Sequence, residues 1–311
     1  MSYASHVPET YELDGDDARE TLTNTGRLAL LRDSFVRLRA ADGFSHDRSL
    51  AFIVSLVLVQ GLIVLVGIAA AFGTGRVIGA VLEAIDRTIP GPASNLLTNA
   101  VEQATRVGND NRILALMLGF VGLLVTATTG MGQLERALNR LYGIEKDRPT
   151  PVKYLRALVL AVSAGAVIAT GFVLLAFGRG LLETSVGSVL QWPLAILLVA
   201  AGLGVLFSYA PNRRQPQWPW LAFGAGIAVL LWSVATLLLA LSFRVSSNFG
   251  DTYGPLAGLV ALQLWTLISA CAILYGGAVM AQLEAVRAGV TEPREERREE
   301  TRARVPVAAK S

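Results

Sequence analysis

The charged residues of this chain lie outside six long apolar stretches, and this separation constrains the fold more than any other feature of the sequence. Each stretch reaches the roughly 20 residues with which an α-helix crosses a hydrocarbon core about 30 Å thick. Strands of a membrane barrel would instead give alternating segments of about 10 residues. The sequence therefore predicts an all-α, polytopic membrane bundle with about six transmembrane helices. The predicted spans are 49–75, 113–132, 157–178, 189–210, 220–243 and 256–283.

Two polar tails flank the predicted six-helix membrane domain, residues 27–286. Residues 1–26 are acidic with few apolar partners, which is typical of a disordered, solvated tail. Residues 287–311 form a charged C-terminal tail, either a solvated helix or disordered. Residues 27–40 predict an amphipathic basic helix, which lies either on an anionic membrane face or against the protein's own loops. Its apolar residues at helical spacing are Leu28, Leu31, Phe35 and Leu38.

The basic residues next to the spans predict the orientation of the bundle. Six arginines fall on one side, and every other basic residue among the 27 falls on the side of the two tails. Cytoplasmic loops carry the excess of Lys and Arg, so we expect both termini in the cytoplasm. The same flanks account for the net charge of +3, and no nucleic-acid partner is expected. The six arginines on the other side are Arg76, Arg87, Arg106, Arg112, Arg179 and Arg244.

The longest connection on the outer side, residues 76–112, carries its own pattern. Apolar residues recur at helical spacing in two runs, 77–85 and 96–104, and Pro90-Gly91-Pro92 separates them. Proline cannot continue a helix and glycine suits a turn, so the segment predicts an outer amphipathic helical hairpin. The hairpin either packs on the helices that it connects, which is the commoner role of a loop, or covers a cavity, or lies in the outer headgroup region.

Few residues of this chain could carry enzymatic chemistry. Two histidines precede the first span and there is one cysteine, Cys271, so no cluster has metal-ligand spacing. The sequence has no Gly-x-Ser-x-Gly elbow and no Gly-x-x-x-x-Gly-Lys phosphate loop. A hydrolytic nuclease needs metal ligands or another means of activating its nucleophile. We therefore expect no enzymatic activity, no metal and no cofactor.

The cores of the predicted spans hold no ionisable side chain, which argues against a proton-coupled or sodium-coupled carrier. Glu135 and Glu284 lie at the ends of the second and sixth spans. Each is close in sequence to arginines, so we expect interfacial salt bridges rather than coupling sites. The expected partners are Arg136 or Arg140 for Glu135, and Arg287 for Glu284.

Three segments keep a fixed order relative to the predicted spans. They are Ala137-Leu138-Asn139-Arg140-Leu141-Tyr142 with Arg148-Pro149; Tyr209-Ala210-Pro211-Asn212-Arg213-Arg214 with Phe223-Gly224-Ala225; and Asn248 through Tyr253-Gly254 with Gly258, Leu264-Trp265 and Gly276-Gly277-Ala278. Together they resemble the YihY/BrkB family of bacterial inner-membrane proteins, once labelled ribonuclease BN, over roughly residues 35–290.

The resemblance implies a six-helix protein of the bacterial plasma membrane with an outer helical hairpin. It supplies no reaction, and export of small solutes or handling of lipids is the activity that it suggests. The first span departs from the family pattern, which resembles Ala-Leu-Ser-Tyr followed by a serine and a proline. The corresponding positions here are Phe52, Val57 and Gln60.

The candidate site residues are polar groups at the two ends of the spans and within them. They suit the gates and walls of a conduit, and they suit equally well the capping and anchoring of helix ends. The candidates are Asn139, Tyr142, Arg148, Asn212 and Arg213 on the cytoplasmic side, Asn248 and Tyr253 on the outer side, and Gln60 and Gln263 within the spans.

These observations favour a passive or exchange-type transporter or exporter of a small neutral or amphipathic solute or lipid. A non-transporting membrane scaffold or envelope-integrity protein is the alternative, and a ribonuclease is remote because its chemistry is missing. The expected partners are the lipid bilayer and an unidentified small solute or lipid, and a homo-oligomer stays open.

Overall fold

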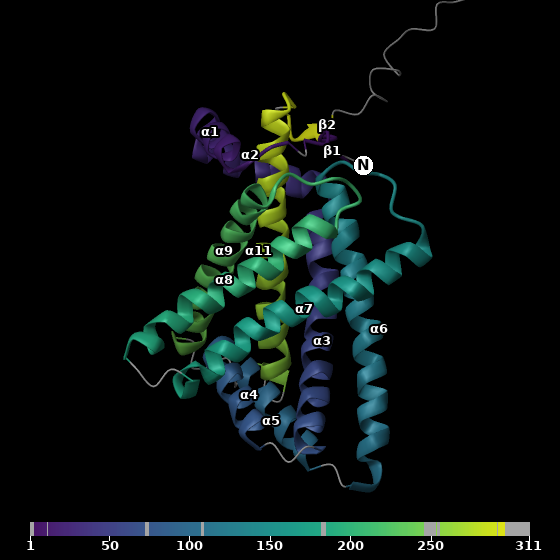
Figure 1. Ribbon diagram of the computed structural model, residues 1–311, viewed down its shortest axis with the longest axis vertical. Coiled ribbons are helices and arrows are strands. Elements are labelled where there is room, and N and C mark those ends of the chain that lie inside the picture. The colour runs from purple at the N-terminus through teal and green to yellow at the C-terminus, as the bar shows by residue number, and fades with distance from the viewer. Residues whose placement is uncertain are drawn as a thin grey trace, which may run out of the picture.

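The protein is a bundle of long helices in the computed structural model shown in Figure 1. The structure describes residues 3–10, 12–71, 75–106, 109–181, 185–245, 253, 256–290 and 292–295. Five helices are long and apolar enough to cross a membrane, and they confirm the predicted all-α membrane bundle. These helices are α3 (Gly43–Ala71), α6 (Asn109–Leu141), α7 (Thr150–Leu181), α9 (Trp218–Val245) and α11 (Ala257–Arg287).

The fourth predicted span corresponds to α8 (Ser185–Tyr209). Its described apolar part is shorter, Pro193–Tyr209. Helix α8 packs along α7 and also contacts α9, and in Figure 1 both α7 and α8 run at a slant to the central α11. Helix α11 contacts α9, α3, α2 and α5, so the last predicted span is the centre of the bundle.

Glycines bring α9 and α11 into close contact. A Cβ added at Gly276 of α11 would lie 2.7 Å from both the Gly224 carbonyl oxygen and the Ala228 Cβ of α9. Without a hydrophobic driving force between helices in lipid, close van der Waals packing of this kind holds a bundle together. The family segments around Gly224 and Gly276 therefore meet in space and form one helix–helix contact.

Substitution Gly276→Ala should destabilise the protein by about 1–3 kcal/mol, because the added methyl group overpacks the α9–α11 contact. Gly226 is the matched control, since nothing lies within 4 Å of a Cβ added there. Gly226→Ala should be neutral or stabilising by up to about 1 kcal/mol, as expected for glycine in a helix. Thermal unfolding in mild detergent measures both, and equal melting temperatures for the two variants would contradict the close contact.

The predicted hairpin is present as α4 (Gly75–Thr88) and α5 (Pro92–Thr105), joined by a tight turn. Gly91 in the turn has a φ of +63°, and a Cβ there would lie 2.5 Å from the Phe243 ring of α9. Proline at the first position of α5 and glycine before it explain why the chain reverses here. Helix α5 packs against α3 and α11, so the hairpin is an integral part of the bundle.

The N-terminal residues have ordered positions at the other end of the bundle. Helix α1 (Gly15–Thr25) begins at Asp14, whose carboxylate accepts the backbone N–H groups of Asp16 and Asp17. Strand β1 (Tyr3–Ala4) pairs antiparallel with β2 (Arg294–Glu295). The acidic composition of residues 1–26 predicted a solvated tail. Composition shows neither the capping box that Asp14 forms with Asp17 nor the pairing of β1 with a strand near the other end of the chain. The division into domains stays a prediction.

Helix α2 (Arg27–Ala40) packs against the protein, which was one of the two placements left open by the sequence, and its placement on a membrane face stays a prediction. Leu30 and Leu38 are buried against the protein, whereas Leu28 is 83% exposed and Phe35 is also exposed. The helix therefore packs on the bundle, mainly on α11, and still presents apolar side chains outward. We call the end that carries β1, β2 and α2 the terminal end, and the opposite end the hairpin end (Figure 1).

Candidate functional site

A buried cluster of polar side chains lies at the terminal end, where α2, α6 and α11 meet the segment after α8. Arg213 and Glu284 form an ion pair of 2.5 Å, with side chains 2% and 0% exposed. The Arg213 guanidinium also lies 4.4 Å from the centroid of the Tyr142 ring. Arg37 donates from Nε to Gln282 Oε1 at 2.7 Å. We call these five residues the terminal cluster.

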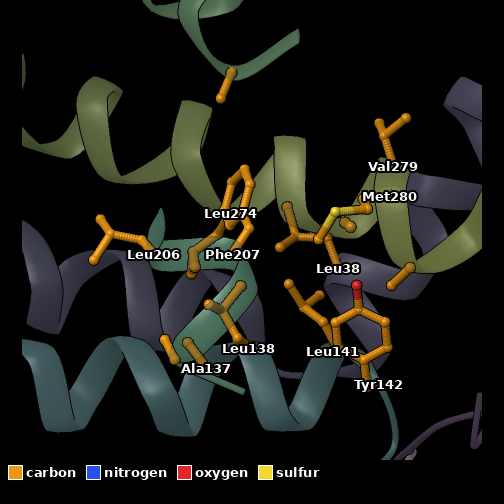
Figure 2. Packing of buried hydrophobic residues seen from close by; sticks show 14 of the residues in the cluster. Leu38, Ala137, Leu138, Leu141, Tyr142, Leu206, Phe207, Leu274, Val279 and Met280 are labelled. Carbon is orange, nitrogen blue, oxygen red and sulfur yellow. The ribbon is translucent and has the colours of Figure 1, made fainter. Parts of the chain in front are cut away.

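The terminal cluster rests on an apolar layer that Figure 2 shows in close-up. Side chains of α6, α8 and α11 meet there, and the Tyr142 ring belongs to the same layer. Residues in the view include Leu38, Leu138, Leu141, Phe207, Leu274 and Met280. Because this layer excludes water, the charges above it must satisfy one another.

The N-terminal segment covers the terminal cluster with its backbone. Arg37 donates to the carbonyl oxygens of Ser5 and Leu141, each at 2.9 Å. Arg213 donates to the Pro8 carbonyl oxygen at 2.9 Å, and the Thr10 hydroxyl donates to Glu284. Residues 3–10 therefore cover the terminal cluster, and Ala4 and Val7 among them belong to the apolar core at this end.

Burial changes the proton affinities of two members of the cluster. Burial lowers the pKa of the Arg37 guanidinium to about 10, although Tyr142 and Glu284 oppose the change. Burial raises the pKa of the Tyr142 phenol far above its usual range, and the nearby Glu284 raises it further. Near neutral pH Arg37 is still a cation and Tyr142 is still protonated.

Tyr142→Phe should become progressively more stable than the original protein as the pH rises above about 10. The buried Tyr142 phenol keeps its proton in the folded state and loses it in the unfolded state, so folding binds a proton in that range. Each pH unit then adds about 1.4 kcal/mol to the difference between the two proteins, and the difference is constant below pH 10. Unfolding in detergent at stepped alkaline pH measures it, and a pH-independent difference would refute the buried phenol.

A second set of polar contacts ties the α6–α7 connection to the segment after α8. Arg148 forms an ion pair of 3.1 Å with Glu135 and donates to the carbonyl oxygens of Ala210 and Pro211 at 2.8 and 2.6 Å. Burial lowers the pKa of Arg148, and Glu135 opposes this. These bonds attach the end of α8 to α6.

Asn139, one helical turn after Glu135 in α6, also ties α6 to the segment after α8. Its amide donates to Asp147 at 3.0 Å, and its oxygen accepts the Asn212 backbone N–H at 2.7 Å. Lys153 pairs with the same Asp147 at 2.6 Å. Burial tends to raise the pKa of Asp147, but the hydrogen bonds from Lys153 and Asn139 outweigh it and hold the pKa below its usual range.

The structure thus brings all five candidates of the predicted cytoplasmic side together at the terminal end. Four of them form hydrogen bonds that join the ends of α6 and α8 or hold the N-terminal segment, as expected for residues that anchor helix ends. The Tyr142 ring contacts Arg213, but its hydroxyl is buried without a hydrogen-bond partner among the described residues. Two predicted pairings are wrong: Glu135 pairs with Arg148, and Glu284 pairs with Arg213. Arg287 instead reaches Asp17 and Glu20 of α1. Sequence neighbours were favoured because partners distant in the chain leave no local signal.

The remaining candidates are not part of this cluster. Gln263 of α11 donates to the Ser55 hydroxyl of α3 at 3.1 Å, which links two helices. Gln60 lies at the α3–α6 contact beside Gly122, and its carbonyl oxygen is buried without a hydrogen-bond partner among the described residues. Tyr253 is 44% exposed, and Asn248 lies outside the described residues.

Sequence reasoning missed one ionisable residue inside a membrane-length helix. Asp47 of α3 is 0% exposed, and the Cys271 thiol of α11 donates to its Oδ2 at 3.2 Å. Its Oδ1 is buried with no partner in the part of the chain that is described. The predicted span began at residue 49, whereas α3 begins at Gly43 and carries Asp47 into the bundle. Asp47 thus lies near the beginning of α3 and outside the predicted span, whose residues are all uncharged.

A cavity of about 870 Å³ lies at the hairpin end, between the α4–α5 turn, α8 and α9. We call it the hairpin cavity. One part of its wall is apolar, with Ile196 and Val199 from α8 and Leu237 from α9. The polar part includes Thr236 and Arg244 of α9. A cavity under the hairpin was one of the alternatives left open by the sequence, but its lining residues could not be predicted, because they come from three separate segments.

The protein is a polytopic integral membrane protein. It has several membrane-length helices around one central helix and an integral hairpin, and the described residues form no extramembrane domain. The family model described as Virulence factor BrkB matches residues 34–302. The chain therefore belongs to this family, and the resemblance seen in the sequence is confirmed.

Relatives of known name cover much of the chain. YfkH of Bacillus subtilis, named as ribonuclease-like, is 26% identical over 82% of this chain and 95% of its own length. A UPF0761 membrane protein of Idiomarina loihiensis is 24% identical over 65% of this chain and 74% of its own. The UPF0761 membrane protein YihY of Salmonella newport is 30% identical over 57% and 61%. No solved structure matches the chain.

The two UPF0761 names state a membrane protein and no reaction. Within the described residues, no group of three or more His, Cys, Asp and Glu side chains could hold a metal ion. The hairpin cavity is therefore the candidate binding site of this protein.

Proposed function

We propose that this protein transports an amphipathic small molecule or lipid, and that the hairpin cavity is its binding site. The observation that carries the proposal is the mixed composition of the cavity wall, which is apolar along α8 and at Leu237 of α9 and polar at Thr236 and Arg244 of α9. Its volume of about 870 Å³ lies within the range of roughly 300–1,000 Å³ that is typical of ligand pockets.

Two polar groups in the cavity favour a ligand with a polar head. Arg244 forms no ion pair or hydrogen bond within the described part of the chain, and it lines the cavity. The Thr236 hydroxyl also lines it and is buried without a hydrogen-bond partner among the described residues. The missing hydrogen bond of the buried Thr236 hydroxyl costs free energy, and a ligand head that bonds to it would recover that cost. Arg244 is exposed and contributes a positive charge to the cavity wall.

The turn of the hairpin is the element that would open and close the cavity. It contributes Ile89, Gly91 and Pro92 to the wall, and Gly91 rests on Phe243. The flanking helices are held by buried Ile85 and Leu97, so a movement of the turn needs no displacement of the whole hairpin. Lids commonly move in this way, with the change confined to a few residues.

Binding of a dansylated fatty acid tests the site directly, with energy transfer from tryptophan as the readout, since Trp232 lines the cavity. Ala240→Trp fills the cavity and should weaken binding by about tenfold or more. Leu238→Trp is the matched control, because Leu238 lies on the same helix, is 59% exposed and does not line the cavity. Equal affinity of the two variants would overturn the proposed site.

Flux from proteoliposomes separates a transporter from a scaffold. The original protein and Leu238→Trp should release the dansylated probe across the bilayer faster than empty liposomes, and Ala240→Trp should not. Binding without any flux would favour a scaffold. The observation that supports a scaffold is that Leu28 and Phe35 of α2 are exposed and could contact a partner.

We also propose that the terminal end faces the cytoplasm of a bacterial plasma membrane. The excess of basic residues on the side of the tails supports it, as do the family's printed membrane-protein names. A green fluorescent protein fused after residue 311 should fluoresce in cells, because that reporter matures in the cytoplasm. An active alkaline phosphatase fused at the same point would show that the C-terminus lies on the outer side and would contradict the proposed orientation.

A further inference from the structure

A basic recess lies at the terminal end, away from the hairpin cavity. It measures about 400 Å³ and is lined by four arginines. Two of these are already paired, Arg148 with Glu135 and Arg213 with Glu284. The recess also contains Tyr209, and its four arginines are Arg148, Arg156, Arg213 and Arg214.

The side chains of the other two arginines are exposed and form no ion pair among the described residues. The guanidinium groups of Arg156 and Arg214 form no ion pair or hydrogen bond in the described part of the chain, although the Arg214 backbone N–H donates to Glu9 at 3.2 Å. Arg156 is close enough to Arg148 to lower its pKa further. A concave group of like charges with two unpaired members favours a bound anion.

An apolar groove of about 480 Å³ leads out of this recess between α7 and α8. Arg156 and Tyr209 line both the groove and the recess, so the two lie next to each other. The rest of the groove is almost entirely apolar, with Leu155, Val159 and Val205 among its lining residues. Leu155 and Val159 are 65% and 58% exposed on a membrane-length helix, so the groove opens toward lipid.

We propose that this recess and groove bind one anionic diacyl phospholipid. The phosphate lies between Arg156 and Arg214, and one acyl chain occupies the groove between α7 and α8. Charge complementarity selects the head, since basic pockets between membrane helices bind anionic head groups. The apolar continuation selects a lipid over a soluble phosphate, which would leave the groove empty.

The site is separate from the hairpin cavity and does not depend on transport. Helix α9 begins at Trp218, four residues after Arg214, and Arg244 lies at its far end. Its 28 residues span about 42 Å at about 1.5 Å per residue, so the two arginines lie at opposite ends of the bundle. A bound lipid would link α7 to the segment between α8 and α9.

Native mass spectrometry and lipid titration in nanodiscs test the proposal, with phosphatidylglycerol as the probe. Arg156→Gln/Arg214→Gln should lower the affinity for phosphatidylglycerol at least tenfold. The control Arg27→Gln/Arg32→Gln removes the same charge from exposed positions of α2 at the same end and should change the affinity little. Equal loss in both double variants would reduce the effect to general surface charge and overturn the site.

A variant of the groove tests the acyl chain independently of charge. Ser163→Phe fills the groove, whereas Val162→Phe on the same helix does not line it. Only Ser163→Phe should weaken phosphatidylglycerol binding, and neither should alter binding of glycerol phosphate. Competition by glycerol phosphate as strong as that by phosphatidylglycerol would show a free-anion site and overturn the lipid assignment. Ala240→Trp should keep phosphatidylglycerol binding, so failure of the transport proposal is distinguishable from failure of this one.

Discussion

Arg213→Met is expected to destabilise the protein by about 3–5 kcal/mol, the usual cost of leaving one partner of a buried ion pair uncompensated. Glu284, which is 0% exposed, would then keep the Thr10 hydroxyl as its remaining partner among the described residues. The carboxyl group would either hold an uncompensated buried charge or take up a proton, and each costs free energy of folding. The methionine cannot donate to Glu284 or to the Pro8 carbonyl oxygen. Thermal unfolding in mild detergent measures the loss.

A double variant separates the cost of an unpaired charge from the loss of the pair itself. Arg213→Met/Glu284→Met should recover most of the stability, because a buried pair replaced by apolar residues of similar volume is often neutral. Arg287→Met is the control, since its pairs with Asp17 and Glu20 are partly exposed and such pairs contribute about 0–1 kcal/mol. A double variant less stable than Arg213→Met alone would contradict this account.

The helices and the hairpin could be predicted from the sequence because both leave a local signal. A membrane-length helix is a run of apolar residues, and Pro90-Gly91-Pro92 interrupts the periodicity where α4 gives way to α5. The boundary of the first span was placed after Asp47 for the same reason. A charge ends an apolar run in the sequence, although the helix itself continues through it.

The partners within the bundle could not be predicted in this way. Glu284 lies three residues from Arg287, yet it pairs with Arg213, 71 residues away. That choice depends on the packing of α11 against the segment after α8, which brings the two side chains into one buried space. The family segments predicted which residues gather at the terminal end, but not the hydrogen bonds that their polar groups form.

The hairpin cavity and the basic recess were even harder to predict from the sequence, because their walls form only when distant segments pack together. Arg244 was counted in the sequence as an outer-side charge, and only the position of the α4–α5 turn places it in a cavity wall. Arg156 was likewise one basic residue among many next to a span. Its role in the proposed lipid site follows from Tyr209, on another helix, which lines the same recess and groove.

The two ends of the bundle therefore differ in a way that bears on mechanism. At the terminal end, ion pairs and hydrogen bonds join α2, α11 and the segment after α8 to the N-terminal segment, which favours a fixed structure. Single polar atoms there, such as the Tyr142 hydroxyl, are still buried without a hydrogen-bond partner among the described residues. At the hairpin end, Thr236 and Arg244 lack partners among the described residues and face a cavity. If the α4–α5 turn opens and closes the hairpin cavity during transport, as proposed, the terminal end would stay rigid while the hairpin end moves.

Arg37→Met tests that rigidity and should cost about 3 kcal/mol or more. Arg37 is the residue that joins α2 to three other parts of the chain, through Gln282 of α11 and the carbonyl oxygens of Leu141 and Ser5. Its removal leaves those three buried acceptors without this donor, and each unsatisfied group costs about 1–3 kcal/mol. Melting temperature and the rate of tryptic cleavage before residue 27 report the loss, because the N-terminal segment loses an anchor.

Arg37→Lys should fail to restore the protein, because one ammonium group cannot reproduce the fixed fork of a guanidinium that reaches three acceptors. Arg39→Met is the matched control, two residues along the same helix and exposed, and should change the melting temperature little. If Arg37→Met and Arg39→Met were equally stable and equally resistant to trypsin, Arg37 would not anchor the N-terminal segment. The N-terminal segment would then be held by its other contacts, which include Thr10 with Glu284, Arg213 with the Pro8 carbonyl oxygen, and the β1–β2 pair.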